Sequence, residues 1–380
     1  MGCSNTKAAL GRDTSPTLDE SSRGGGGGGG GGGGSPASSG NGTPRFTRGL
    51  LEDDWIIDYN NPLGKGHYAT VYAAIERMDE EHRVAVKCIK RAKSKQVRLD
   101  LEIEILRKVS THPNIITLLE CYETDEYVQL VMERVFGGEL FDHIVAKGAY
   151  SEADAAFHVR KCVDALAFLH AKGIVHRDLK PENILLSSKD DAVAEVMLAD
   201  FGLAKLLPER VTTRTVCGTW AYCAPEVKQL RLDYGPKVDV WSIGVILYIL
   251  LVAYHPFDPM GDSTDAQMAR RIRDCRWDFD DAAWDCISSA AKDLLRHMLE
   301  RDQAKRFSAT QCLAHEWLRD DECPGSPPHK PISPRIAEAR SLSPVMFCLC
   351  FLRKHKAPQI ASFSVFSVAH VLCLLMFSKT

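Results

Sequence analysis

The chain contains the octapeptide His176-Arg177-Asp178-Leu179-Lys180-Pro181-Glu182-Asn183, in which a carboxylate, an ammonium and an amide group lie close together. Two longer motifs precede it and two short motifs follow it. In chain order these are Gly64-Lys65-Gly66-His67-Tyr68-Ala69-Thr70-Val71, Val84-Ala85-Val86-Lys87, Asp200-Phe201-Gly202 and Ala224-Pro225-Glu226. Each is a weak signal alone, but chance does not readily place all five in this order and at these separations.

These motifs give residues 55–318 a resemblance to the eukaryotic protein kinase family, and most closely to its calcium/calmodulin-dependent group. The resemblance implies an α+β, two-lobed fold, with a small antiparallel β lobe carrying one helix and a larger helical lobe. It also implies an ATP- and Mg²⁺-dependent enzyme that phosphorylates serine or threonine in proteins. The alternative from another functional class is a pseudokinase that serves as a scaffold. Such proteins usually lose a residue of the catalytic set, and this chain keeps Lys87, Asp178, Asn183 and Asp200.

Length and composition agree with an intracellular enzyme. The 380 residues can hold one large domain plus tails. Hydrophobic residues make up 45%, enough for a core, and a formal net charge of −3 gives no sign of nucleic-acid binding. The 13 cysteines are scattered, and we identify no secretory signal. We therefore expect reduced thiols and a cytoplasmic location.

The hydrophobic pattern changes along the chain from short strands to helices. Short β-rich runs come first, and one segment with apolar residues near a single helical face follows them. After Gly137-Gly138 the pattern is mostly helical. The expected strands are Trp55–Tyr59, Ala69–Glu76 and Arg83–Ile89, and the expected helices are Val97–Val109, Ser151–Lys172 and Val238–Ala253.

The N-terminal residues 1–51 have the composition of a flexible tether, because the unbroken run Gly24–Gly34 can bury almost nothing. The first six residues, Met1 to Thr6, fit the N-myristoylation pattern, with Gly2 as the acceptor. Cys3 is a candidate for palmitoylation, which would turn marginal membrane binding into stable attachment. We expect an acylated, membrane-associated protein, and the alternative is an unmodified terminus.

By the family resemblance, Asp178 accepts the proton of the substrate hydroxyl, and Lys180 stabilises the phosphate during transfer. Lys87 contacts the α- and β-phosphates and pairs with a glutamate on the following helix. Glu102 has the expected register. Glu104 lies about 200° further round the helix, so only one of the two can face the lysine, and we favour Glu102.

The resemblance also implies where the cofactors bind. Asn183 and Asp200 offer oxygen atoms that suit Mg²⁺. Glycines let the backbone lie close to the phosphates, and apolar side chains enclose the adenine. The expected ATP-binding residues are Leu63, Gly64, Lys65, Gly66, His67, Val71, Ala85, Lys87, Met132, Glu133, Val135, Glu139 and Leu185.

Regulation by phosphorylation is implied by Arg177, which precedes the catalytic aspartate. In the family, an arginine at this position is matched by a phosphorylated residue in the activation loop. Thr215 holds that position here, and Thr213 is the next candidate. An upstream kinase is therefore an expected partner.

Two further contacts of the kinase fold are expected away from the reacting groups. Glu226 should pair with Arg306 as a structural tie. Asp239 should anchor the backbone of the catalytic loop.

Substrate preference can be inferred from acidic residues. Glu139 and Glu182 match positions that bind arginine upstream of the phosphorylated residue in basophilic kinases. Thr219 belongs to the segment that faces the residue after the phosphorylation site. We predict protein substrates with an Arg-x-x-Ser/Thr pattern.

The tail, residues 319–380, leaves several alternatives open. We find no calcium-binding loop in it. Met346–Lys356 mixes apolar and basic residues, as a calmodulin target or a membrane-surface segment does. Ile360–Phe377 is almost wholly apolar and could be a membrane anchor, a packed helix or a poorly specified end. The two alternatives for control are calmodulin binding through the tail and phosphorylation of Thr215 alone.

Overall fold

The computed structural model describes residues 45–47, 50–66, 69–91, 96–147, 151–190, 194–206, 220–228 and 234–319. The predicted lipidation residues Gly2 and Cys3 and the two tail segments discussed above lie outside these ranges. Within the described residues, no helix combines the length and the apolar character needed to cross a membrane.

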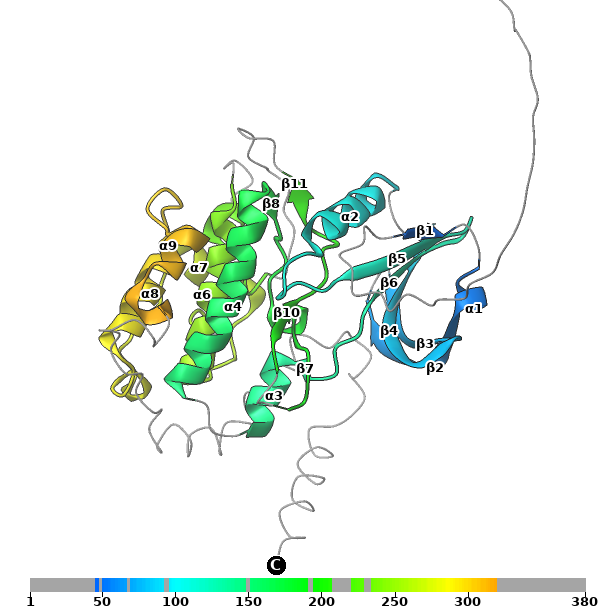
Figure 1. The fold of residues 1–380 in the computed structure, drawn as a ribbon. Coiled ribbons are helices and arrows are strands. Elements are labelled where there is room, and N and C mark those ends of the chain that lie inside the picture. The colour runs from blue at the N-terminus through cyan, green and yellow to red at the C-terminus, as the bar shows by residue number, and fades with distance from the viewer. Residues whose placement is uncertain are drawn as a thin grey trace, which may run out of the picture. The chain divides into compact units, whose positions relative to one another are not determined.

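The first part of the described chain forms a six-stranded sheet (Figure 1). Its strands are β1 (Arg45–Thr47), β2 (Trp55–Lys65), β3 (Ala69–Glu76), β4 (Asp79–Lys90), β5 (Leu118–Glu123) and β6 (Tyr127–Glu133). In space they follow the order β1-β5-β6-β4-β3-β2. Neighbouring strands are antiparallel except β1, which runs parallel to β5. The register pairs Gly64 with Val71 and Val71 with Lys87, so the glycine-containing turn and the lysine lie on adjacent strands.

Side chains alternate between the two faces of this sheet, and both faces are covered. Helix α2 (Gln96–Val109) covers one face with a buried stripe of apolar residues at helical spacing. The short helix α1 (Leu51–Asp54) precedes β2 on the other face, where Leu51 and Trp55 pack with Tyr122. The stripe on α2 consists of Leu99, Ile103, Leu106 and Val109.

The second part is mainly helical (Figure 1). Helix α6 is buried from Val238 to Val252 and packs between α4 and α8. Ser151 and Asp154 form a reciprocal capping box that begins α4. The helices are α3 (Leu140–Lys147), α4 (Glu152–Ala171), α5 (Pro225–Lys228), α6 (Lys237–Val252), α7 (Asp265–Asp274), α8 (Ser289–Met298) and α9 (Ala309–Leu313).

Two small sheets and a 3-10 helix are formed by chain segments that lie between the six-stranded sheet and the helices. Strand β9 (Ile184–Leu186) lies between β7 (Gly138–Glu139) and β10 (Val196–Leu198), and β8 (Ile174–Val175) pairs with β11 (Lys205–Leu206). The 3-10 helix η2 (Pro181–Asn183) leads into β9. A small β lobe with α2 and a larger helical lobe confirm the predicted two-lobed α+β fold.

The segment after α2 forms hydrogen bonds with strand β10 and so holds the two lobes in contact. Ile116 donates its backbone N–H to the Leu198 carbonyl at 3.0 Å, and Leu198 donates to the Asn114 carbonyl at 2.9 Å. The Asn114 side chain also donates to the Val196 carbonyl at 2.8 Å. Strand β10 is therefore held to the segment that follows α2, and this contact positions the Asp200 motif next to the sheet.

Candidate active site

The catalytic loop lies between β8 and η2, and a buried carboxylate anchors its backbone. Asp239, which is fully buried on α6, accepts the backbone N–H groups of His176 at 2.9 Å and Arg177 at 2.8 Å. His170 also contacts this carboxylate at 2.9 Å. Burial alone would raise the pKa of Asp239, but the contact with His170 and these N–H groups outweigh it and hold the pKa below its usual value. The expected anchoring role of Asp239 is confirmed.

Asp178 lies at the centre of a small polar cluster. The ammonium of Lys180 is 3.2 Å from the Asp178 carboxylate. The Asn183 amide donates to the Asp178 carbonyl at 2.7 Å and to its carboxylate at 3.3 Å. Only 8% of Asp178 is exposed. The structure thus brings together the three residues of the octapeptide that the sequence singled out.

Lys87 brings the β lobe and the helical lobe together at a second cluster. Its ammonium is 2.6 Å from the Glu102 carboxylate and 2.9 Å from Asp200. Burial opposes the charge on Lys87, but the two carboxylates outweigh it and raise the lysine pKa above its usual value. The attraction of Lys87 in turn holds the pKa of Asp200 well below its usual range. The predicted Glu102 register is confirmed.

The rival glutamate points elsewhere. Glu104 pairs with Lys108, four residues further along α2, at 2.7 Å. This is an ordinary exposed pair on a helix surface.

The Asp200 motif adopts a backbone conformation that only a well-supported residue keeps. Asp200 has φ of 58°, in the left-handed region. Gly202 donates its N–H to the Asp200 carboxylate at 3.3 Å. A Cβ on Gly202 would lie 3.2 Å from that carboxylate, so the glycine permits close approach. Phe201 packs against His176 with ring centroids 4.8 Å apart, which joins this motif to the catalytic loop.

The residues predicted to bind ATP line adjacent strands. Gly64 and Lys65 end β2, and the Gly66 N–H bonds the Ala69 carbonyl at 2.8 Å across the turn. In the strand register Ala85 lies opposite Met132, and Glu139 lies opposite Leu185. Leu63 is exposed on β2. Glu133 is the last residue of β6, and Val135 lies in the connection that follows this strand toward the helical lobe.

Comparison with known proteins agrees with this geometry. The family model described as protein kinase domain matches residues 57–318. The chain belongs to the protein kinase family. It is 45% identical over 275 residues to myosin light chain kinase A of Dictyostelium discoideum. The aligned residues make up 72% of this chain and 91% of that protein. It is 44% identical over 278 residues to calcium/calmodulin-dependent protein kinase type 1 of Caenorhabditis briggsae, covering 73% and 75%.

A human relative leads to the same group. The kinase is 42% identical over 268 residues to calcium/calmodulin-dependent protein kinase type 1B of Homo sapiens, covering 70% of this chain and 76% of that protein. It is therefore an ATP-dependent serine/threonine protein kinase of the calcium/calmodulin-dependent type. Kinase domains in general use ATP together with Mg²⁺.

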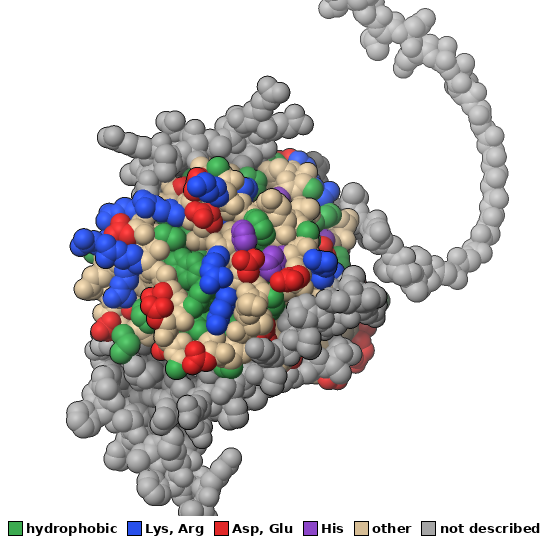
Figure 2. Space-filling model, turned by 90° about the vertical axis from the view of Figure 1, so that its left-hand side faces the viewer, with side chains coloured by type: hydrophobic (Ala, Val, Ile, Leu, Met, Phe, Trp, Pro, Cys, Tyr) green, Lys and Arg blue, Asp and Glu red, His purple; other side chains and the backbone are tan. Residues whose placement is uncertain are grey.

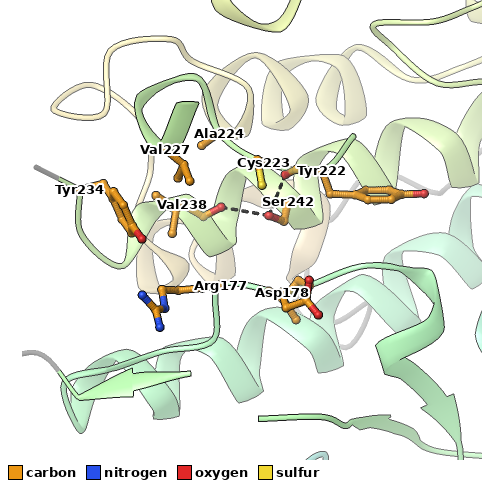
Figure 3. A pocket seen from close by; sticks show the side chains of 10 residues that line it. Arg177, Asp178, Tyr222, Cys223, Ala224, Val227, Tyr234, Val238 and Ser242 are labelled. Carbon is orange, nitrogen blue, oxygen red and sulfur yellow. Dashed lines mark hydrogen bonds between the residues drawn. The ribbon is translucent and has the colours of Figure 1, made fainter. Parts of the chain in front are cut away.

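A small cavity of about 10 Å³ separates the catalytic loop of this kinase from the segment that leads into α5 (Figure 3). Arg177 and Asp178 lie on one side of it, and Tyr222, Cys223 and Ala224 lie on the other. On this second side, the Ser242 hydroxyl of α6 donates to the Tyr222 carbonyl at 2.9 Å. A cavity of this size holds about one water molecule, so the segment is packed closely on the loop.

Two residues that support the site were not predicted from the sequence, and three predicted residues lie outside the described part of the chain. Sequence reasoning missed His170 and Ser242, since nothing in the local sequence links either residue to the loop that it supports. His67, Thr215 and Thr219 lie outside the described residues. The Glu226–Arg306 pair is confirmed: both residues are buried, with nitrogen–oxygen distances of 2.6 and 2.9 Å.

Proposed function

We propose that this kinase phosphorylates serine or threonine residues that follow an arginine by three positions, after its own Thr215 has been phosphorylated. The main support is that two polar clusters meet at one site. Ala199, next to Asp200, donates its N–H to the Asn183 carbonyl at 2.9 Å and accepts a hydrogen bond from His176. The two clusters comprise Lys87, Glu102, Asp178, Lys180, Asn183 and Asp200.

In the proposed mechanism, Asp178 takes the proton of the substrate hydroxyl. The Asn183 amide orients the Asp178 carboxylate and so keeps one of its acceptor oxygens in a fixed direction. Lys180, at 3.2 Å, adds positive charge beside the place where negative charge develops during transfer. Removal of the carboxylate should therefore slow the chemical step more than substrate binding.

When bound, ATP supplies the phosphoryl group and Mg²⁺ neutralises its charge. The donor groups fit such a cation, because Asp200 and Asn183 offer the oxygen ligands that Mg²⁺ prefers. Lys87 keeps Asp200 ionised, and the Asn183 Nδ2 is occupied by Asp178, which leaves its Oδ1 for other partners. Glu102 holds Lys87 in the position from which it can contact phosphate oxygens.

The proposed activity is tested by phosphate transfer from ATP and Mg²⁺ to Ser- and Thr-containing peptides. We expect the Asp178→Asn variant to lose about 10²–10⁴-fold in kcat, with little change in ATP affinity. Inactivity of the wild type, even after phosphorylation of Thr215, would favour the scaffold alternative.

The preference for arginine is supported by the position of two glutamates. Glu139 lies on β7 and Glu182 on η2, and these two elements contact each other. Two carboxylates on adjacent elements can bind a guanidinium through charge-assisted hydrogen bonds. We expect Glu182→Gln to reduce the discrimination between Arg-x-x-Ser and Ala-x-x-Ser peptides by about tenfold, or ~1.4 kcal/mol. Glu126→Gln, on an exposed turn, is the matched control, and equal peptide profiles for both variants would contradict the proposal.

Activation by Thr215 phosphorylation is supported by the state of Arg177. Its Nε donates to the Leu203 carbonyl at 2.7 Å, while its buried Nη1 has no hydrogen-bond partner among the residues that the structure describes. A half-buried guanidinium with one such buried nitrogen suits a phosphate brought in by the activation loop. We expect phosphorylation at Thr215 to raise kcat in the wild type but not in Arg177→Ala. An equal increase in kcat in both proteins would show that Arg177 does not mediate activation by the phosphate.

Membrane attachment and calmodulin binding complete the proposal. The sequence of the first six residues supports acylation of Gly2, with Cys3 as a second site. Incorporation of labelled myristate into the wild type but not into Gly2→Ala would test it. Calmodulin binding by Met346–Lys356 is supported by the names of the relatives, which include calcium/calmodulin-dependent kinases. Calcium-dependent activation that a chain ending at Arg319 lacks would support this second mode of control.

A further inference from the structure

Three exposed arginines gather at the end of α7 and in the turn after it, and we call them the α7 arginine patch: Arg270, Arg273 and Arg276. All three surround the carboxylate of Asp274, at 3.8, 3.4 and 3.7 Å. Their side chains are 70%, 54% and 69% exposed, whereas that of Asp274 is 26% exposed. The single carboxylate of Asp274 is thus shared by three guanidinium groups, and each arginine side chain is more than half exposed to solvent.

A fourth arginine adjoins this patch. Arg271, also exposed on α7, adds a fourth positive charge and points its guanidinium to the Phe257 carbonyl and the Ser263 hydroxyl, both at 3.4 Å. Asp278 and Asp281, which follow the patch, keep their negative charge, but each directs a carboxylate oxygen to a backbone N–H group within its own turn. Figure 2 shows basic side chains gathered at one side of a face of the kinase domain, with acidic side chains beside them.

We propose that the α7 arginine patch binds an anionic lipid surface. Exposed ion pairs with Asp274 are weak and easily rearranged, so the guanidiniums can turn to an external anion at little cost. Asp274 occupies the point on which the three arginines converge, and it would repel a single phosphate group placed there. Anionic headgroups spread over a surface can instead meet each guanidinium from outside.

The patch would act together with the N-terminus but does not depend on it. A single myristoyl chain binds membranes only marginally, and stable attachment takes a second signal such as a basic surface. As the flexible tether that its composition predicts, the segment between Gly2 and Leu50 would span on the order of 40 Å. An acyl chain and the patch could then contact the same membrane.

The test uses the full chain produced without acylation, so that failure of the patch and failure of acylation are separate results. Binding is measured by co-sedimentation with phosphatidylcholine vesicles that contain or lack phosphatidylserine. We expect binding only with phosphatidylserine, and weaker binding as salt rises. The variant with Arg270, Arg273 and Arg276 all changed to Gln should bind about a hundredfold more weakly, at about fivefold per charge.

Two further variants make the test specific. A control with the same loss of charge carries Arg83→Gln, Lys172→Gln and Lys189→Gln, all exposed elsewhere, and should bind as the wild type does. Asp274→Asn removes the central acid and should tighten binding about fivefold.

Peptide phosphorylation in solution should be unchanged in every variant, which would exclude misfolding. Equal binding by the α7 variant and its charge-matched control would overturn the proposal. So would tight binding to a soluble phosphopeptide without binding to vesicles, because that result would identify a protein ligand instead.

Discussion

Lys87 holds two carboxylates that come from different lobes, and its loss should affect catalysis more than folding. Without the ammonium, the buried Glu102 and the nearby Asp200 would face each other as like charges. We expect Lys87→Met to lower kcat by about 10²–10³-fold. Lys90→Met, on the exposed end of the same strand, should keep normal activity. Steady-state kinetics with ATP at saturation distinguishes the two variants, and a similar loss in both would indicate a general effect on the strand.

Asp239 makes the catalytic loop sensitive to acid. Its pKa in the folded protein lies below the unfolded value of about 3.9, so the folded state binds the proton less readily. The carboxylate therefore contributes its full stability above that pH, and the contribution is lost as pH falls through the lower folded pKa. We expect Asp239→Asn to reduce the free energy of unfolding by about 3 kcal/mol at pH 7, and to flatten the fall in stability below about pH 4.

Urea unfolding at pH 7 and at several acidic values would measure this difference. Asp125→Asn, on an exposed turn, serves as the control and should leave both quantities nearly unchanged. A loss of stability in Asp239→Asn that is the same at every pH would mean that packing, not the charge, is responsible.

Individual site residues were largely predictable because the motifs are local. Helix geometry showed that only one of Glu102 and Glu104 can face Lys87, and the register expected from the family resemblance favoured Glu102. The contact between His170 and Asp239 was not predictable, since these residues are 69 positions apart and meet only through the packing of α4 on α6. The positive φ of Arg177 and Asp200 likewise depends on tertiary support that no propensity for arginine or aspartate indicates.

At the level of elements, α6 and α8 approach closely at a glycine. A Cβ on Gly244 would lie 2.9 Å from the Met298 Cβ and 3.0 Å from Leu299, which is closer than side chains normally come. We expect Gly244→Ala to lower stability by about 1–3 kcal/mol, because one of the two helices must shift. Gly235→Ala is the matched control, since nothing lies within 4 Å of its added Cβ. Thermal unfolding of both variants tests the contact, and equal melting temperatures would contradict it.

The expected strands and helices were found, but several boundaries differ. Strand β2 continues to Lys65 and β4 begins at Asp79, because pairing with β3 extends both strands beyond their apolar runs. Helix α1 and strand β1 were not expected. Each is too short to produce a periodic pattern, and each exists because the sheet offers a surface or an edge to pair with.

Across the whole molecule, the Glu226–Arg306 pair joins the end of the activation segment to the core of the helical lobe. Arg306 is fully buried, lies over the Trp241 ring at 4.9 Å, and donates to the carbonyls of Glu300 and Lys237. We expect Arg306→Met to lower the free energy of unfolding by about 3–5 kcal/mol, since it leaves Glu226 buried and unpaired.

The double variant Arg306→Met/Glu226→Gln should recover part of this loss, because it also removes the unpaired charge. Arg301→Met, exposed nearby, is the control. Chemical denaturation measures all four proteins. A double variant no more stable than Arg306→Met would assign the loss to the carbonyl and aromatic contacts of the arginine.

The cover that α1 and Trp55 place on the sheet has a practical consequence for dissecting the enzyme. The family match begins at residue 57, after both Leu51 and Trp55. A catalytic fragment excised at that point would lose the side chains that shield Tyr122 and its apolar neighbours. It would also lose Asp54, whose carboxylate accepts a hydrogen bond from the Tyr122 hydroxyl at 2.7 Å. Such a fragment would retain every reacting group but would expose a hydrophobic surface of the sheet. We therefore expect its defect to be self-association and not impaired phosphotransfer.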